Sequence, residues 1–201
     1  MSAVLHNPLE LPAGLPAPVD DGGARHLVGM SWPDLALPGS DGASPGSDGA
    51  SINLSGLRGR AVVYAFPRTG RPGEPLPTGW DAIPGARGCS PQSCGFRDHF
   101  AELGALGVGR LYGLSTQSRD DQREVAQRLH LPFALLSDAR LELQRALKLP
   151  TFVVDGMTLL RRLTLVLDDG VITKVFYPVF PPDRSAAEVV AWLRDAQSTI
   201  A

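Results

Sequence analysis

Thiols are scarce in this chain of 201 residues, which has only two cysteines, Cys89 and Cys94. Two cysteines alone are too few for a structural zinc site. Such a pair often amounts to two small buried hydrophobic residues. A reactive role therefore has to be argued from the residues around them.

A large excess of either charge is also absent, because 19 Lys and Arg residues stand against 21 Asp and Glu residues, for a net charge of -2. This balance favours neither nucleic acid nor an anionic membrane as a partner. No apolar stretch approaches the roughly 20 residues that span a bilayer. Residues 1–7 lack the basic start and apolar run of a signal peptide. We therefore expect a cytoplasmic protein, in which a disulfide is more often transient and catalytic than structural.

Glycine and proline, in contrast, are abundant, with 22 and 18 residues concentrated in the first half of the chain. Residues 1–28 contain repeated prolines, so we expect an N-terminal extension that lies extended on the domain or stays mobile. Residues 29–201 then form one domain of ordinary size. A direct repeat at residues 38–44 and 45–51 predicts a lengthened surface loop.

Strands and helices alternate along this domain. Residues 61–66 are apolar and predict a central strand, and a Gly/Pro-rich loop then leads to Cys89 at the start of a helix. The inward stripe of this helix consists of Phe96, Phe100, Leu103 and Leu106, and Gly107 ends it. Further expected elements are strands at residues 111–115, 132–136, 161–167 and 171–177, and helices that begin at residues 116–118, at Asp138 after the N-cap Ser137, and after Asp183. This order predicts an α/β, thioredoxin-like fold, with a central mixed β-sheet flanked by helices and an N-terminal extension.

The position of Cys89 favours a reactive thiolate. Pro91 suits the first turn of a helix, where its missing N–H costs nothing. Cys89 therefore lies near the unpaired N–H groups and the positive dipole end of that helix. Such a site, especially with cations close by in sequence such as Arg87 and Arg97, stabilises a thiolate.

Cys94 falls inside the same helix as Cys89. Residues five apart in a regular helix are rotated by about 140° and separated by a rise of about 7.5 Å. That separation is too large for a disulfide. A bond between the two cysteines would require the first helical turn to unwind, so the spacing predicts a conformational switch tied to oxidation rather than a static disulfide.

Residues 88–98, which read Gly-Cys-Ser-Pro-Gln-Ser-Cys-Gly-Phe-Arg-Asp, resemble the active-site segment of peroxiredoxins. The resemblance is to the bacterioferritin-comigratory or Q-type subfamily, which reads Gly-Cys-Thr, three variable residues, Cys, a small residue and Phe-Arg-Asp. It extends from about Trp32 to the C-terminus by the order of elements. It implies that Cys89 is the peroxidatic cysteine and Cys94 the resolving cysteine.

The chain departs from the family pattern just before Cys89. The family places a proline seven residues and a threonine three residues before the cysteine, where this chain has Ala82 and Ala86. Pro67 instead follows the central strand, as the family's proline does, and residues 70–85 form a long insertion before the cysteine. The resemblance therefore assigns the proline role to Pro67, and Thr69 is the nearest candidate for the threonine role.

The family also uses an arginine on a later strand, typically in the sequence Arg-x-Thr-Phe. Arg162, followed by Leu163 and Thr164, resembles that segment. Arg161 is adjacent and would point to the other face of a strand. The resemblance thus makes Arg162 the active-site arginine, and the alternative is a solvated arginine at a strand edge.

The resemblance implies a thiol-dependent peroxidase that acts on hydrogen peroxide and organic hydroperoxides. The Cys89 thiolate would attack the O–O bond, Arg162 would stabilise the developing charge, and the resulting sulfenic acid would form a disulfide with Cys94. Thioredoxin or a similar dithiol would reduce that disulfide by exchange. We expect no metal or organic cofactor, and a monomer or weak homodimer.

Two other functions fit the same cysteines. A peroxide-sensing switch protein would use both sulfurs without catalytic turnover. A disulfide reductase is a weaker alternative, because thioredoxin-type enzymes use Cys-x-x-Cys and the spacing here is longer.

Overall fold

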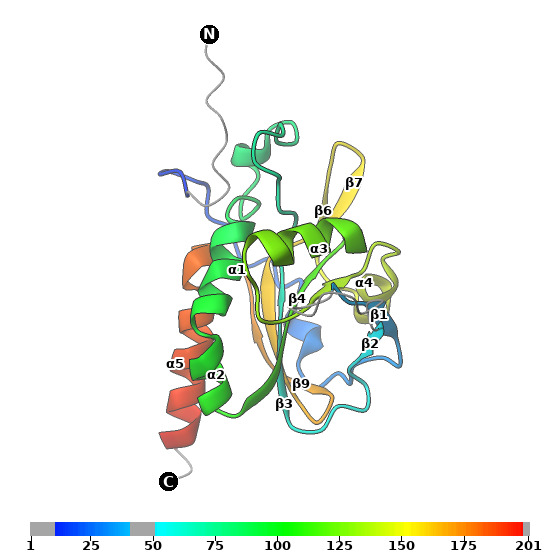
Figure 1. The fold of residues 1–201 in the computed structure, drawn as a ribbon, viewed down its shortest axis with the longest axis vertical. Coiled ribbons are helices and arrows are strands. Elements are labelled where there is room, and N and C mark those ends of the chain that lie inside the picture. The colour runs from blue at the N-terminus through cyan, green and yellow to red at the C-terminus, as the bar shows by residue number, and fades with distance from the viewer. Residues whose placement is uncertain (1–10, 41–50, 199–201) are drawn as a thin grey trace.

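The computed structural model describes residues 11–40 and 51–198, so the first ten residues of the extension and most of the direct repeat lie outside the described residues. A five-stranded mixed sheet forms the centre of the molecule, with strand order β5-β4-β3-β8-β9 (Figure 1). Its parallel part consists of β3 (Arg60–Ala65), β4 (Val108–Ser115) and β5 (Leu135–Ser137). Its antiparallel part consists of β8 (Leu163–Asp168) and β9 (Val171–Phe176). The predicted central strand and mixed sheet are confirmed.

Helices cover this sheet on both faces. The helices are α1 (Cys89–Asp98), α2 (Phe100–Ala105), α3 (Arg119–Arg128), α4 (Glu142–Leu147) and α5 (Ser185–Ser198), with short 3-10 turns η1 (Arg25–Leu27), η2 (Trp80–Ala82) and η3 (Pro182–Arg184). One apolar cluster joins α1, α2, α3 and α5 to one face of the sheet. A second cluster joins α4, η1 and a hairpin formed by β1 (Ala36–Pro38) and β2 (Ser51–Asn53) to the other face. Side chains alternate between the two clusters along β3, as strand geometry requires.

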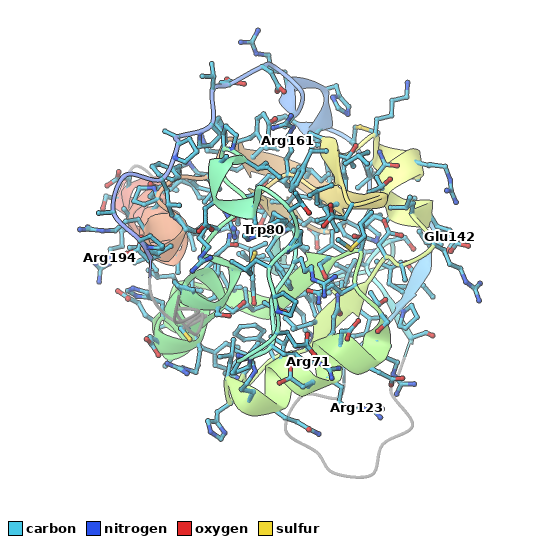
Figure 2. All side chains as sticks on the ribbon, turned by 90° about the horizontal axis from the view of Figure 1, so that it is seen from above. Arg71, Trp80, Arg123, Glu142, Arg161 and Arg194 are labelled. Atoms are coloured by element: carbon cyan, nitrogen blue, oxygen red, sulfur yellow. The ribbon has the colours of Figure 1, made fainter. Side chains whose placement is uncertain are left out.

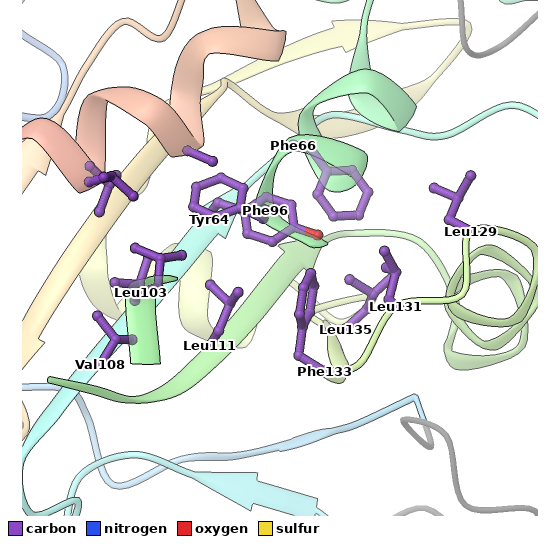
Figure 3. Close-up of a cluster of buried hydrophobic side chains, with 14 of the residues drawn as sticks. Tyr64, Phe66, Phe96, Leu103, Val108, Leu111, Leu129, Leu131, Phe133 and Leu135 are labelled. Atoms are coloured by element: carbon purple, nitrogen blue, oxygen red, sulfur yellow. The ribbon is translucent and has the colours of Figure 1, made fainter. Parts of the chain in front are cut away.

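Aromatic stacking fixes α1 on the central strand. The rings of Tyr64 and Phe96 lie 4.3 Å apart between centroids and are inclined by only 10°. Phe133 meets Tyr64 edge-on at 5.9 Å (Figure 3). These contacts bury Phe96, and Leu103 of the predicted stripe is also buried, but the expected inward position of Phe100 is wrong, because its side chain is 38% exposed. The single helix expected after Cys89 is, however, two helices, because the backbone leaves helical values at His99 (φ -93°, ψ 6°) before α2 begins.

Two hairpins accompany the central sheet. Strands β1 (Ala36–Pro38) and β2 (Ser51–Asn53) form the first. Strands β6 (Thr151–Val154) and β7 (Met157–Leu160) form the second, which the sequence reading did not resolve. Its turn is Asp155-Gly156, with φ values of 47° and 73°, and an Asp-Gly pair is a recognisable hairpin signal.

The expected N-cap Ser137 is wrong. Ser137 ends β5, and its hydroxyl donates to the Gln117 carbonyl at 2.7 Å. The helix begins later, at Glu142, after Leu141 takes a left-handed conformation. The Asp138 carboxylate satisfies the first turn instead, because it accepts from the N–H groups of Leu143 and Gln144 at 3.1 and 2.8 Å.

The described part of the N-terminal extension runs along the outside of the domain from residue 11 (Figure 1). Ala24 and Leu27 are buried in the second apolar cluster, so the extension is anchored in the core before residue 29. Within residues 11–40 and 51–198, no helix is both long enough and apolar enough to cross a bilayer.

Candidate active site

Cys89 is the first residue of α1, as the sequence predicts, and its side chain is only 4% exposed. The preceding residue, Gly88, has a φ of 97° and forms the N-cap. A Cβ at Gly88 would lie 2.3 Å from Pro182 Cγ, so only glycine fits there. The Cys89 thiol donates to the Ala86 carbonyl at 3.6 Å.

The arginine singled out by the sequence lies against this sulfur. Arg162 Nη2 donates to Cys89 Sγ at 3.3 Å, across 73 positions of sequence. The same nitrogen lies 3.1–3.2 Å from the carbonyl oxygens of residues 85, 86 and 87. Because a guanidinium is always charged, it holds a permanent cation beside the thiol. Arg162 lies in the link between β7 and β8 rather than on a strand, which corrects the expected strand position.

Gln92 completes this arrangement, and the sequence reading missed it. Its side chain is fully buried one helical turn after Cys89. Gln92 Oε1 accepts a hydrogen bond from Arg162 Nη1, and Nε2 donates to Ser185 Oγ at 3.3 Å. Ser185 in turn lies 3.1 Å from the Thr164 hydroxyl. The only sequence signal for this role is the i,i+3 spacing from Cys89, which places both residues on one helix face.

Pro67 and Thr69 are both buried in the link after β3. The backbone N–H and hydroxyl of Thr69 both donate to Gln117 Oε1, at 2.8 and 3.1 Å. Gln117 Nε2 returns a bond to the Thr69 carbonyl at 3.2 Å. The hydrogen bonds found for Thr69 therefore hold it to the loop after β4, not to Cys89. Catalytic roles for Pro67 and Thr69 stay predictions.

The insertion at residues 70–85 packs on the β6–β7 hairpin. Trp80 is buried in a third apolar cluster with Ala86, Val154 and Leu159. The Trp80 and Phe152 rings lie 6.2 Å apart, and the N–H of Thr78 donates to Asp155 at 2.9 Å. In the view of Figure 2 onto this end of the molecule, Trp80 lies near the middle. The third apolar cluster holds the methyl group of Ala86 in place. It thereby also positions the Ala86 carbonyl, which accepts from the Cys89 thiol.

Cys94 lies five residues further along the continuous helix α1, half-buried, and both cysteines are free thiols. Burial raises the pKa of the Cys94 thiol. The helical turn between the cysteines is tied down, because the Tyr64 hydroxyl donates to Ser93 Oγ at 3.1 Å and the Gln92 N–H donates to the Gly88 carbonyl at 3.0 Å. A Cys89–Cys94 disulfide therefore requires this turn to open.

Comparison with known proteins agrees with this geometry. The Redoxin family model matches residues 27–191. The chain belongs to the Redoxin family. The curated "Peroxiredoxin Q, chloroplastic" of Sedum lineare is 29% identical over 71% of this chain and 68% of its own length. The protein of the same name from Oryza sativa subsp. japonica is 29% identical over 83% of this chain and 66% of its own length. This chain thus spans about two thirds of those relatives.

The solved structure of Peroxidoxin BcpB from Mycobacterium tuberculosis matches 84% of this chain and 96% of its own, with 24% identity and a TM-score of 0.62. Together these matches confirm the predicted thioredoxin-like fold and the resemblance to Q-type peroxiredoxins. The enzyme class expected from that family, a thiol peroxidase, follows. Among the described residues, no group of three or more His, Cys, Asp or Glu side chains is arranged to hold a metal ion.

Proposed function

We propose that this protein reduces hydrogen peroxide and organic hydroperoxides, with Cys89 as the peroxidatic cysteine and Cys94 as the resolving cysteine. One observation carries the proposal: the Cys89 sulfur lies at the N-terminus of α1 and 3.3 Å from Arg162 Nη2. A helix N-terminus and an adjacent guanidinium both place positive potential beside the sulfur that acts as the nucleophile.

In the first step the Cys89 thiolate attacks one peroxide oxygen. The S–O bond forms as the O–O bond breaks, so Cys89 becomes a sulfenic acid. The second oxygen leaves with the electron pair and takes up a proton to become water or an alcohol. Arg162 already lies beside the sulfur, and it stabilises the negative charge that moves from sulfur to the leaving oxygen.

In the second step the Cys94 sulfur attacks the sulfenic sulfur, a disulfide forms and water leaves. The turn from Cys89 to Ser93 must unwind first, which breaks the Gln92 bonds to Arg162 and Ser185 and the Ser93 bond to Tyr64. Opening also exposes the Cys94 thiol, whose pKa burial raises in the closed helix. Resolution is thus gated by the opening of α1.

An external dithiol, thioredoxin or a similar reductant, then returns both cysteines to thiols by exchange. The enzyme works in the cytoplasm as a monomer or weak homodimer, without a metal or organic cofactor.

One observation favours a second function, a peroxide-sensing switch without turnover. Several buried hydrogen bonds hold the turn between the cysteines, and they slow the opening that each catalytic cycle requires.

The test is consumption of hydrogen peroxide by the reduced protein with thioredoxin and thioredoxin reductase. We expect wild type to turn over repeatedly, Cys89→Ser to be inactive, and Cys94→Ser to consume about one equivalent and stop. Wild type that also stops after one equivalent would instead support the sensor. Activity in Cys89→Ser would overturn the assignment of the two cysteines.

A further inference from the structure

Residues 11–21, here called the strap, lie outside the part of the chain that matches the Redoxin family. Pro12, Pro16 and Pro18 fall within these residues. Proline-rich segments are extended and stiff. In Figure 1 the strap, in dark blue, lies beside the upper end of α1, where Cys89 is located.

The strap contacts both ends of the loop that precedes the cysteine. At one end, a Cβ placed on Gly88 would lie 2.6 Å from Leu11 Cδ2 and 2.3 Å from Pro182 Cγ. At the other end, a Cβ on Gly85 would lie 3.3 Å from Pro18 Cγ. Both glycines are thus in direct contact with strap side chains, and the loop of residues 85–88 lies beneath the strap.

The strap is also anchored beyond these contacts. Asp21 accepts a hydrogen bond from the Tyr177 hydroxyl at 2.8 Å and from the N–H of Gly23 at 2.9 Å. Ala24 and Leu27 follow within the buried core. A stiff segment that is anchored in this way is pressed onto the loop rather than free to swing away.

The loop beneath the strap is the wall of the peroxide site. The carbonyls of residues 85, 86 and 87 lie against Arg162 Nη2, and Cys89 directly after the loop is 4% exposed. The apolar side chains of Leu11 and Pro18 thus cover a loop that borders the buried sulfur. An apolar surface beside a reactive group discriminates between substrates by size more than by polarity.

We propose that the strap makes this site selective for small peroxides, with Leu11 and Pro18 as the specificity-determining residues. Hydrogen peroxide reaches Cys89 past the strap, whereas a bulky hydroperoxide such as cumene hydroperoxide is hindered. The inference rests on the proposed function, since it names the substrate class of the same cysteine.

The test measures kcat/KM for hydrogen peroxide and for cumene hydroperoxide with the full chain and the thioredoxin system. Wild type prefers hydrogen peroxide, and Leu11→Ala raises kcat/KM for cumene hydroperoxide by about tenfold while the value for hydrogen peroxide changes less than about twofold. Pro18→Ala has the same direction and a smaller size. Leu11→Met, which keeps the bulk, retains the wild-type preference. Val19→Ala is the matched control, because Val19 belongs to the strap but is 85% exposed.

A second measurement does not depend on peroxidase activity. In the Cys94→Ser background, Leu11→Ala accelerates alkylation of Cys89 by a bulky N-aryl maleimide more than alkylation by iodoacetamide. An unchanged ratio of the two alkylation rates, together with an unchanged peroxide preference, overturns the role of the strap. Absence of hydrogen peroxide turnover in wild type overturns the proposed function instead, and the alkylation ratio still decides whether the strap controls access.

Discussion

On one side of Cys89 lie Arg162, Gln92 and Ser185, buried polar side chains joined by hydrogen bonds. On the other side lie the strap and the insertion, which reach the same loop through leucine, proline and tryptophan side chains. The polar side fixes charge and direction at the sulfur. The leucine, proline and tryptophan side chains of the apolar side carry no charge, so we expect them to fix where the loop lies and what can pass. We therefore expect changes on the polar side to affect every peroxide alike, and changes on the apolar side to affect substrates by size or act through folding.

The sharpest separation of the two sides comes from Arg162→Gln. Loss of a preorganised donor to developing negative charge lowers kcat by about 10²–10³, and we expect equal factors for hydrogen peroxide and cumene hydroperoxide. Stopped-flow measurement of the rate of Cys89 oxidation by each of the two peroxides gives both factors. Arg161→Gln is the matched control, since Arg161 is the neighbour in sequence and its charged side chain interacts with Asp21 and Tyr177. A loss of rate that differs strongly between the two peroxides would contradict the expectation that the polar side acts on every peroxide alike.

Gln92→Leu tests whether the polar side also holds the helix closed. The change leaves buried groups of Arg162 and Ser185 without their partner, which costs roughly 1–3 kcal/mol of stability. The loss falls on the turn that must open, so we expect peroxide attack to slow by about tenfold and disulfide formation with Cys94 to accelerate. Separate stopped-flow phases for sulfenic acid formation and resolution report the two effects. If sulfenic acid formation and resolution slow equally, Gln92 positions Arg162 but does not hold the helical turn closed.

Ala86→Thr probes the apolar side at the position where the family has threonine. The Ala86 methyl is fully buried in the cluster with Trp80, so a hydroxyl there loses its water and costs about 1–3 kcal/mol of stability. Urea unfolding measures this cost, and Ala82→Thr at an exposed position of the insertion is the control. An Ala86→Thr variant that is more active than wild type and equally stable would show that the threonine hydroxyl interacts with the Cys89 sulfur.

The smallest expected effect concerns pH. Burial raises the folded-state pKa of Cys94, so the closed protein retains this proton where the open chain has lost it. The raised pKa of the Cys94 thiol contributes to the free energy of unfolding. This contribution is fully present below the pKa of the thiol in the unfolded chain, about 8.5, and it is lost as the pH rises above that value. Urea unfolding of the reduced protein between pH 7 and 10 should therefore show a steeper loss for wild type than for Cys94→Ser. Parallel curves would exclude the linkage.

Sequence patterns were most informative where a local signal and a buried face coincide. The central strand, the cysteine at the start of α1 and the arginine beside it all agree with the structure. Gln92 escaped because a polar residue in an amphipathic helix normally faces water, and only the tertiary position of Arg162 buries it. The Asp155-Gly156 turn of the β6–β7 hairpin is a local signal that was missed. Which surface the hairpin covers is not encoded locally, because its buried apolar residues, apart from Leu160, pack in the cluster with the insertion.

The strap and the helix break illustrate a different limit. Repeated prolines exclude regular structure in the strap but do not say which surface it lies on. That surface is decided by Gly85 and Gly88, more than 65 residues away in sequence, which leave space for Pro18 and Leu11. At His99, the apolar stripe continues in register across the break, so periodicity alone could not reveal it.

Trp80, described above as a packing residue, also gives the protein an optical signal. Its indole shares a cluster with Ala86, whose carbonyl accepts from the Cys89 thiol. The chain has three tryptophans, and the other two lie at Trp32 and Trp192, in clusters that do not contain Ala86. When the first turn of α1 opens and the loop shifts, the surroundings of Trp80 change, and so do those of Trp192, which packs on the cluster that contains Cys89. We therefore expect intrinsic fluorescence to follow oxidation and reduction without a label, and the difference between wild type and Trp80→Phe to isolate the signal from the loop.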